Sequence, residues 1–237
     1  MKHLLYSGGI FHDFPEMARA LSEVFSGAGY TTEISDDLEH CAHSLQAGGI
    51  DLFTVYALRW TMRDGAKYEP YRERWALEVS LPARRRIEAY VRGGGGLLAL
   101  HTAVICFDDW EEWASMVGGA WVWGQSSHPP LQAVDIKLAA STHSVTQGLS
   151  NFTLDDEVYQ SLALREHVTV LATANTANEA TWHPVVWTHE YGSGRVMCDT
   201  LGHDVSSLRE PAHAALLQRG ARWLTNQRRV SGDGQYA

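Results

Sequence analysis

The chain of 237 residues has few cysteines and no long apolar run, and each shortage excludes a class of protein. Its three cysteines, Cys41, Cys106 and Cys198, lie far apart without a CxxC pair, which argues against a disulfide framework or a thiolate zinc site. No apolar stretch approaches the ~20 residues that span a bilayer, so we expect no membrane helix. The opening apolar residues reach Ser7-Gly8-Gly9 too early for a signal peptide, and we therefore expect a cytoplasmic protein.

Positive charge is also scarce, because 19 Lys and Arg stand against 28 Asp and Glu and give a formal net charge of -9. Such a chain repels phosphate backbones and anionic lipid, so we expect no nucleic-acid partner and no membrane partner. The one dense basic run, Arg84-Arg85-Arg86, falls inside a helical pattern and is typical of a solvated helix face. A hydrophobic fraction of 45% is ordinary for a globular protein and excludes disorder.

A dinucleotide-binding glycine fingerprint is missing as well. Gly93 to Gly96 precede an apolar run, whereas the fingerprint opens a helix, so we expect no nicotinamide cofactor. Abundant instead are 12 His and 9 Trp, a combination that suits a polar site with aromatic walls. Several of the tryptophans gather in the middle of the chain: Trp60, Trp75, Trp110, Trp113, Trp121 and Trp123.

Strand and helix patterns alternate along the first half of the chain. Short apolar runs predict buried strands at 2–6, 30–34, 50–56 and 97–100. Helical spacing and end signals predict helices at 15–28, 36–47, 81–91 and 108–117. Residues 58–79 have no clear period, and we interpret them as an insertion or lid on the substrate side.

The second half is richer in strands, which we predict at 131–138, 168–172, 184–189 and 195–201. Tyr191-Gly192-Ser193-Gly194 predicts a tight hairpin turn between the last two, and a closing helix is expected at 211–224. The whole pattern predicts an α/β fold, a three-layer sandwich with a mostly parallel sheet. We expect one domain over residues 1–227 and a flexible tail over residues 228–237.

Histidines follow three of the predicted strands. His12 comes shortly after the first strand, His101 directly after the run at 97–100, and His203 directly after the strand at 195–201. Because ligands gather at the carboxyl ends of strands in open α/β sheets, these side chains are expected to meet at one edge. The alternative is that each is an ordinary surface or hydrogen-bonded histidine.

An ordered series of motifs resembles one protein family. Its clearest members are Gly94-Gly95-Gly96-Leu97-Leu98-Ala99-Leu100-His101-Thr102-Ala103, Ser127-His128-Pro129-Pro130, Asp156-Glu157-Val158-Tyr159 and Leu201-Gly202-His203-Asp204. In their order from Ser7 to Thr225, the motifs resemble the trehalose-utilisation (ThuA-like) proteins. The resemblance implies the class I glutamine amidotransferase-like (flavodoxin-like) fold.

Enzymes of that superfamily carry a cysteine nucleophile at the strand-to-helix elbow, where this chain has His101. Cys106 lies five residues further on and cannot replace it without remodelling the turn. A Cys-dependent amidotransferase or peptidase is therefore disfavoured, since imidazole forms poor acyl-enzymes.

Two interpretations of the candidate site stay open. His101, His128, Glu157 and His203, with His12 in reserve, could hold a divalent metal such as zinc, manganese or iron(II). Alternatively, His101 and His203 act as general acid and base without a metal. The expected catalytic residues are His101, His203, Asp204 and Glu157, with Asp204 orienting His203. The expected substrate-binding residues are His12, Tyr159, His183 and Trp110.

The resemblance implies a role in the metabolism of trehalose and related glycosides, beside an NAD-dependent sugar dehydrogenase that makes 3-keto derivatives. The substrate would be a small sugar, a glycoside or 3-keto-glycoside, and the activity that of a lyase, hydrolase or isomerase that stabilises an enolate. The alternative is a sugar-binding or regulatory module without catalysis. Whether the chain forms a homo-oligomer stays open.

Overall fold

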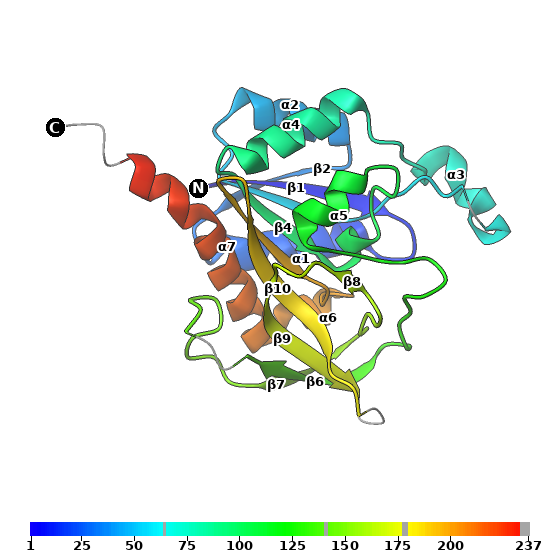
Figure 1. Ribbon diagram of the computed structural model, residues 1–237, viewed down its shortest axis with the longest axis vertical. Helices are drawn as coiled ribbons and strands as arrows, with labels where there is room; N and C mark the ends of the chain where they lie inside the picture. Colours follow the sequence, from blue (N-terminus) through cyan, green and yellow to red (C-terminus); the bar gives the residue numbers. More distant parts are fainter. Residues whose placement is uncertain (64, 140–141, 177–179, 233–237) are drawn as a thin grey trace.

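One large sheet organises the computed structural model, which describes residues 1–63, 65–139, 142–176 and 180–232 (Figure 1). Its nine strands lie in the order β2-β1-β3-β4-β11-β10-β9-β6-β7. The first five in this order run parallel: β2 Thr31–Ser35, β1 Lys2–Gly9, β3 Leu52–Leu58, β4 Gly96–Leu100 and β11 Gly194–Asp199. The others continue antiparallel: β10 His183–Tyr191, β9 Thr169–Thr176, β6 Gln132–Leu138 and β7 Phe152–Asp156.

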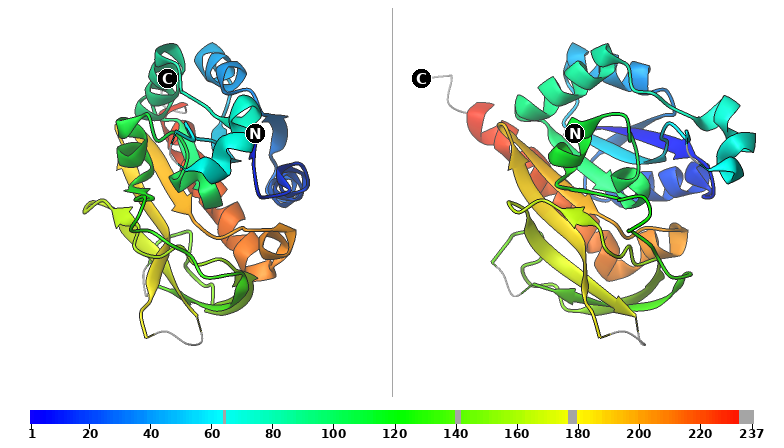
Figure 2. Two further views of the ribbon diagram at one scale, coloured as in Figure 1. Left: turned by 90° about the vertical axis from the view of Figure 1, so that its right-hand side faces the viewer. Right: turned by 45° about the vertical axis from the view of Figure 1, so that its right-hand side comes forward.

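Helices cover both faces of the sheet (Figures 1 and 2). On one face pack α1 Phe14–Ser26, α6 Val205–Arg209 and α7 Pro211–Gly232, and on the other α2 Leu38–Ala47, α4 Leu81–Arg92 and α5 Glu111–Val117. The smaller elements are η1 Ala66–Tyr68, α3 Glu69–Trp75, η2 His101–Val104 and the pair β5 Gly119–Ala120 and β8 Ala163–Leu164.

Alternation along the buried strands explains the two cores. Leu97 and Ala99 of β4 pack with α2, α4 and α5, whereas Leu98 and Leu100 pack with α1, α6 and α7. All four side chains are buried, as expected for a parallel strand covered on both faces. The predicted three-layer α/β sandwich is therefore confirmed.

Local signals explain how α1 begins beside the site. The Asp13 carboxylate accepts a hydrogen bond from the backbone N–H of Glu16, and Pro15 stands in the first turn, where it sacrifices no helical hydrogen bond. Met17, Leu21 and Phe25 then supply the apolar stripe that packs on the sheet. The loop between β1 and α1 therefore ends at a capped helix start whose helix packs on the sheet.

Three predicted boundaries differ from the structure. The helix expected at 108–117 begins only at Glu111, because Asp108 accepts hydrogen bonds from Thr61 and Asp109 accepts one from the backbone N–H of Val79. The predicted insertion at 58–79 contains η1 and α3. Helix α7 continues to Gly232, so the first half of the expected tail is helical, while residues 233–237 lie outside the described residues.

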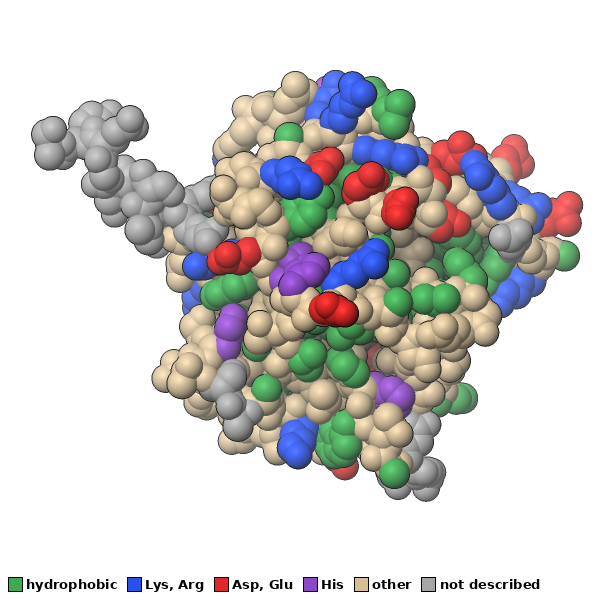
Figure 3. Space-filling model, viewed as in Figure 1, with side chains coloured by type: hydrophobic (Ala, Val, Ile, Leu, Met, Phe, Trp, Pro, Cys, Tyr) green, Lys and Arg blue, Asp and Glu red, His purple; other side chains and the backbone are tan. Residues whose placement is uncertain are grey.

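Charged side chains of both signs are interspersed on the face shown in Figure 3. Among the described helices, none is long and apolar enough to cross a membrane.

Candidate active site

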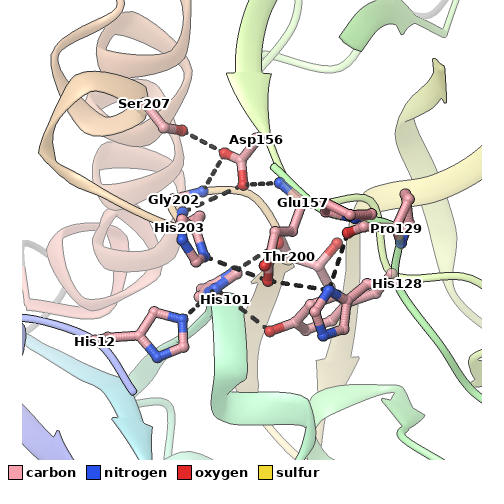
Figure 4. A network of polar contacts seen from close by, with 12 residues as sticks. His12, His101, His128, Pro129, Asp156, Glu157, Thr200, Gly202, His203 and Ser207 are labelled. Atoms are coloured by element: carbon pink, nitrogen blue, oxygen red, sulfur yellow. Dashed lines mark hydrogen bonds and ion pairs between the residues drawn. The ribbon is translucent and has the colours of Figure 1, made fainter. Parts of the chain in front are cut away.

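The three histidines that follow β1, β4 and β11 lie together at the carboxyl edge of the parallel strands (Figure 4). Their ring centroids are 5.1 Å apart for His12 and His101, 4.9 Å for His12 and His203, and 5.5 Å for His101 and His203. The three strands run parallel within the stretch β1-β3-β4-β11 of the sheet, so their carboxyl ends lie at the same edge although the residues are far apart in sequence. The structure thus brings together the imidazoles that the strand ends suggested.

His101 occupies a sharp elbow between β4 and η2. Its φ of 51° lies in the left-handed region, which a non-glycine residue adopts only when its surroundings hold it there. Its buried Nδ1 donates a hydrogen bond to the carbonyl of Thr200, at 3.0 Å. Because a carbonyl can only accept, the proton is on Nδ1 and the lone pair of Nε2 faces the cavity.

His12 faces His101 in the same tautomer. Its Nδ1 lies 3.3 Å from the carbonyl of Ile10, and its Nε2 lies 3.2 Å from Nε2 of His101. Two lone pairs therefore point at each other, an arrangement that needs a proton or a metal cation between them. Burial lowers the pKa of both imidazoles, most strongly that of His101, so a proton is disfavoured there.

Glu157 follows the edge strand β7 and supplies the negative charge of the cluster. Its Oε2 lies 3.3 Å from Nδ1 of His203 and 3.3 Å from Nδ1 of His128. Burial raises the pKa of Glu157, but the two histidines outweigh it and hold that pKa well below its usual value. The carboxylate in turn raises the pKa values of His128 and His203.

Four side chains are close enough to share one metal ion: His12, His101, Glu157 and His203 offer ligand atoms that all lie within 4.8 Å of one another. With metal–ligand distances of about 2.0–2.1 Å, neighbouring ligands of a tetrahedral ion lie about 3.3 Å apart. The 3.2 Å and 3.3 Å separations above match that spacing. Nδ1 of His203 is also buried without a regular hydrogen bond, so the donor set fits a cation.

Three members of the cluster, His12, Glu157 and His203, line a cavity of about 300 Å³ with aromatic walls, here called the histidine pocket, and the fully buried His101 lies directly behind them. Its walls include Trp60, Tyr68, Trp121 and Trp123. The indole N–H of Trp121 is buried without a hydrogen-bond partner in the part of the chain that the structure describes. The pocket therefore offers flat apolar faces and a free donor, the two features that bind sugar rings.

A buried carboxylate supports the loop that carries His203. Asp156 accepts hydrogen bonds from the backbone N–H groups of Gly202 at 2.7 Å and His203 at 3.2 Å, and from the hydroxyl of Ser207 (Figure 4). Burial raises its pKa to about 6 despite these bonds. Asp156 is not among the site residues expected from the sequence, because no local signal shows which distant backbone groups it binds.

The structure corrects two expected roles. Asp204 accepts from the backbone N–H of Ser207 and the hydroxyl of Ser206, so it caps α6, and the carboxylate beside the His203 ring is Glu157. Trp110 is buried in the core against Phe107 and Trp113 and does not line the histidine pocket.

The other expected residues divide between the pocket and its surroundings. Tyr159 lines the pocket, and its hydroxyl lies 3.3 Å from Nε2 of His101. His128 lines the pocket but lies outside the group of four possible metal ligands. His12, expected only as a reserve ligand, belongs to that group instead. His183 begins β10 and does not line the pocket. Cys106 is buried beneath it, with its thiol donating to the carbonyl of Ala57.

Comparison with known proteins relates the chain to one family. A family model described as trehalose utilisation, ThuA, matches residues 73–224. No curated protein matches the sequence. Two solved structures described as thua-like proteins share the fold: one from Parabacteroides merdae has a TM-score of 0.75, 20% identity, and covers 96% of this chain and 90% of its own. The other, from Bacteroides uniformis, has a TM-score of 0.69, 18% identity, and covers 94% and 91%.

A third neighbour, described as a cytoplasmic protein from Salmonella typhimurium LT2, has a TM-score of 0.68 and 17% identity over 95% of this chain and 100% of its own.

Proposed function

Because this chain belongs to the ThuA family of trehalose utilisation, we propose that it is an enzyme of carbohydrate metabolism that acts on 3-keto-glycosides. The observation that carries this proposal is the convergence of three imidazoles and one carboxylate, of which His12, His203 and Glu157 line a tryptophan-walled pocket and His101 lies buried behind them. The ring faces would hold the sugar, and the polar cluster would act on its oxygen atoms.

A ketone at C3 makes the neighbouring C2–H acidic, and this explains why the polar cluster is useful. A base removes the C2 proton, and the C–H electron pair forms an enolate between C2 and C3. When the C3 carbonyl re-forms, the electrons move to a C1–C2 double bond, the C1–O bond breaks, and the leaving oxygen takes a proton. Addition of water to the product gives net hydrolysis, and return of the proton elsewhere gives isomerisation, so lyase, hydrolase and isomerase share this first step.

The chain's own residues divide this work by position. His12, His101, Glu157 and His203 would hold the cation beside which the enolate oxygen forms. Tyr159 lies beside them with its hydroxyl on His101. His128 stands outside this group on the pocket wall, with 41% of its side chain exposed and its Nδ1 3.3 Å from Glu157, and we assign it the transfer of the proton from C2 to the leaving oxygen.

A zinc, manganese or iron(II) ion would be held by His12, His101, Glu157 and His203 and would polarise the C3 carbonyl as a Lewis acid. The facing lone pairs of His12 and His101 and the buried Nδ1 of His203 support this assignment. The ketone itself would come from an NAD-dependent sugar dehydrogenase, and we place both proteins in the cytoplasm.

Metal analysis combined with a turnover assay tests the proposal. The purified protein is expected to contain about one divalent ion per chain and to convert 3-keto-trehalose, and His101→Ala should lose both properties. His40→Ala, a change at an exposed histidine paired with Glu33, is the matched control and should keep both. Absence of metal together with an untouched keto-glycoside would exclude the enzyme, and sugar binding without turnover would identify a binding module.

A further inference from the structure

A second, larger hollow lies beside the histidine pocket. It has a volume of about 930 Å³ and is formed at the ends of β1 and β2 over the start of α1. We call it the outer hollow; its walls include Ser7, Asp13, Arg19, Asp36, Arg74 and Trp75. Phe11 and His12 line both spaces, so the two adjoin at these residues.

An unpartnered hydroxyl indicates that the outer hollow binds something. The side chain of Ser7 is only 6% exposed, and its Oγ has no hydrogen-bond partner within the described residues. A buried polar atom without a partner costs free energy that a bound hydroxyl group would recover. The neighbouring Gly8, with a φ of 151°, adds no side chain beside Asp36 and Trp75 of the hollow.

The junction between the two spaces is also unusual. Phe11 has a φ of 69°, in the left-handed region, and its side chain is 62% exposed. It lies edge to face with Tyr71, at 5.5 Å between ring centroids. A strained, exposed aromatic residue beside a catalytic histidine is typical of a ligand contact.

The charges in the outer hollow favour a neutral polar ligand. Two carboxylates, Asp13 and Asp36, are balanced by two guanidinium groups, Arg19 and Arg74, so neither a phosphate nor a cation is selected. The carboxylate of Asp13 is already used as the cap of α1. Donors and acceptors spaced around an aromatic wall suit the hydroxyl groups of a sugar.

We propose that the outer hollow binds the second ring of a two-ring glycoside while the reacting ring occupies the histidine pocket. This inference rests on the proposed function. A pocket of about 300 Å³ is at the small end for ligand sites and leaves little room for a second ring, which the adjoining hollow supplies. The bond between the rings then crosses beside His12, where it breaks.

The test compares a two-ring substrate, 3-keto-trehalose, with a one-ring substrate, methyl 3-keto-glucoside. Ser7→Ala should lower kcat/KM for the two-ring substrate by about threefold to tenfold, the value of one hydrogen bond, and leave the one-ring substrate unaffected. Arg74→Gln should also lower kcat/KM for the two-ring substrate more than for the one-ring substrate. Ser26→Ala, at an exposed serine at the end of α1, is the control and should change neither rate.

Loss of a partnerless hydroxyl should not lower the melting temperature, so misfolding is separable from loss of binding. Equal effects on both substrates, or no effect on either, would overturn the second-ring site. If wild type converts neither substrate, the proposed function fails. Titration calorimetry of sugar binding then tests separately whether the outer hollow binds a second ring. Tighter binding of trehalose than of methyl glucoside, reduced by Ser7→Ala, would then support it, and equal binding of the two sugars would refute it.

Discussion

The buried ion pair between His213 and Asp199 should make the stability of this protein depend on pH. Nε2 of His213 lies 3.2 Å from Oδ2 of Asp199, and both side chains are fully buried. Nδ1 of His213 lies 2.8 Å from the carbonyl of Ser207, so a protonated ring can donate from both nitrogens. The perturbation we consider is removal of this proton, either by raising the pH or by substitution.

The size of the effect follows from the pKa of His213. Burial lowers that pKa, but the charge of Asp199 outweighs burial and raises it from 6.5 to about 8. A histidine whose pKa is higher in the folded state stabilises that state fully below pH 6.5 and loses this contribution as the pH rises through 8. The difference corresponds to about 2 kcal/mol of unfolding free energy, at about 1.4 kcal/mol for each pH unit.

Urea denaturation of wild type and His213→Gln at pH 6, 7, 8 and 9 measures the effect. Glutamine can donate one hydrogen bond to Asp199 but does not titrate, so the wild-type advantage should shrink by about 2 kcal/mol between pH 6 and 9. His43→Gln, at an exposed histidine of α2, should follow the wild type at every pH. If His213→Gln keeps the full pH dependence of the wild type, the ion pair does not titrate as we reason.

Three further predictions concern the site. Asp156→Asn should lower the unfolding free energy by about 1–3 kcal/mol, because an amide accepts fewer of the N–H groups of the His203 loop; wild-type stability in denaturation would contradict this. Trp121→Phe should raise KM for the keto-glycoside several-fold with a change in kcat of less than about twofold, since the indole N–H has no partner among the described residues; an unchanged KM would show that it does not contact substrate. Alkylation with iodoacetamide should leave turnover intact, because burial raises the pKa of Cys106 to about 12; inactivation of folded protein would support a thiol mechanism.

Patterns within a few residues were enough to predict the architecture. The apolar run Leu97-Leu98-Ala99-Leu100 forms a strand buried on both faces because its period and length exclude other elements. The convergence of His12, His101 and His203 also follows from sequence, since the ends of parallel strands meet at one edge regardless of their separation in the chain.

Roles within the site depended on contacts between distant segments. Asp156 ends β7 and Glu157 follows it, at the far edge of the sheet from β1, yet they contact His203 and its loop after β11. No local pattern encodes that meeting, because it results from how the antiparallel half of the sheet packs against α6.

Tertiary contacts also decide which of several residues of the same chemical type belongs to the site. Trp110 and Trp121 have the same side chain, but one packs in the core and the other lines the pocket. His12 joins the group of four while His128 stays on the wall, and Asp204 caps a helix where Glu157 binds the histidines. Secondary structure follows from local periodicity, so the sequence alone determined which strands and helices form. Which side chains meet depends on directions set by the packed layers, and only the tertiary structure decided that.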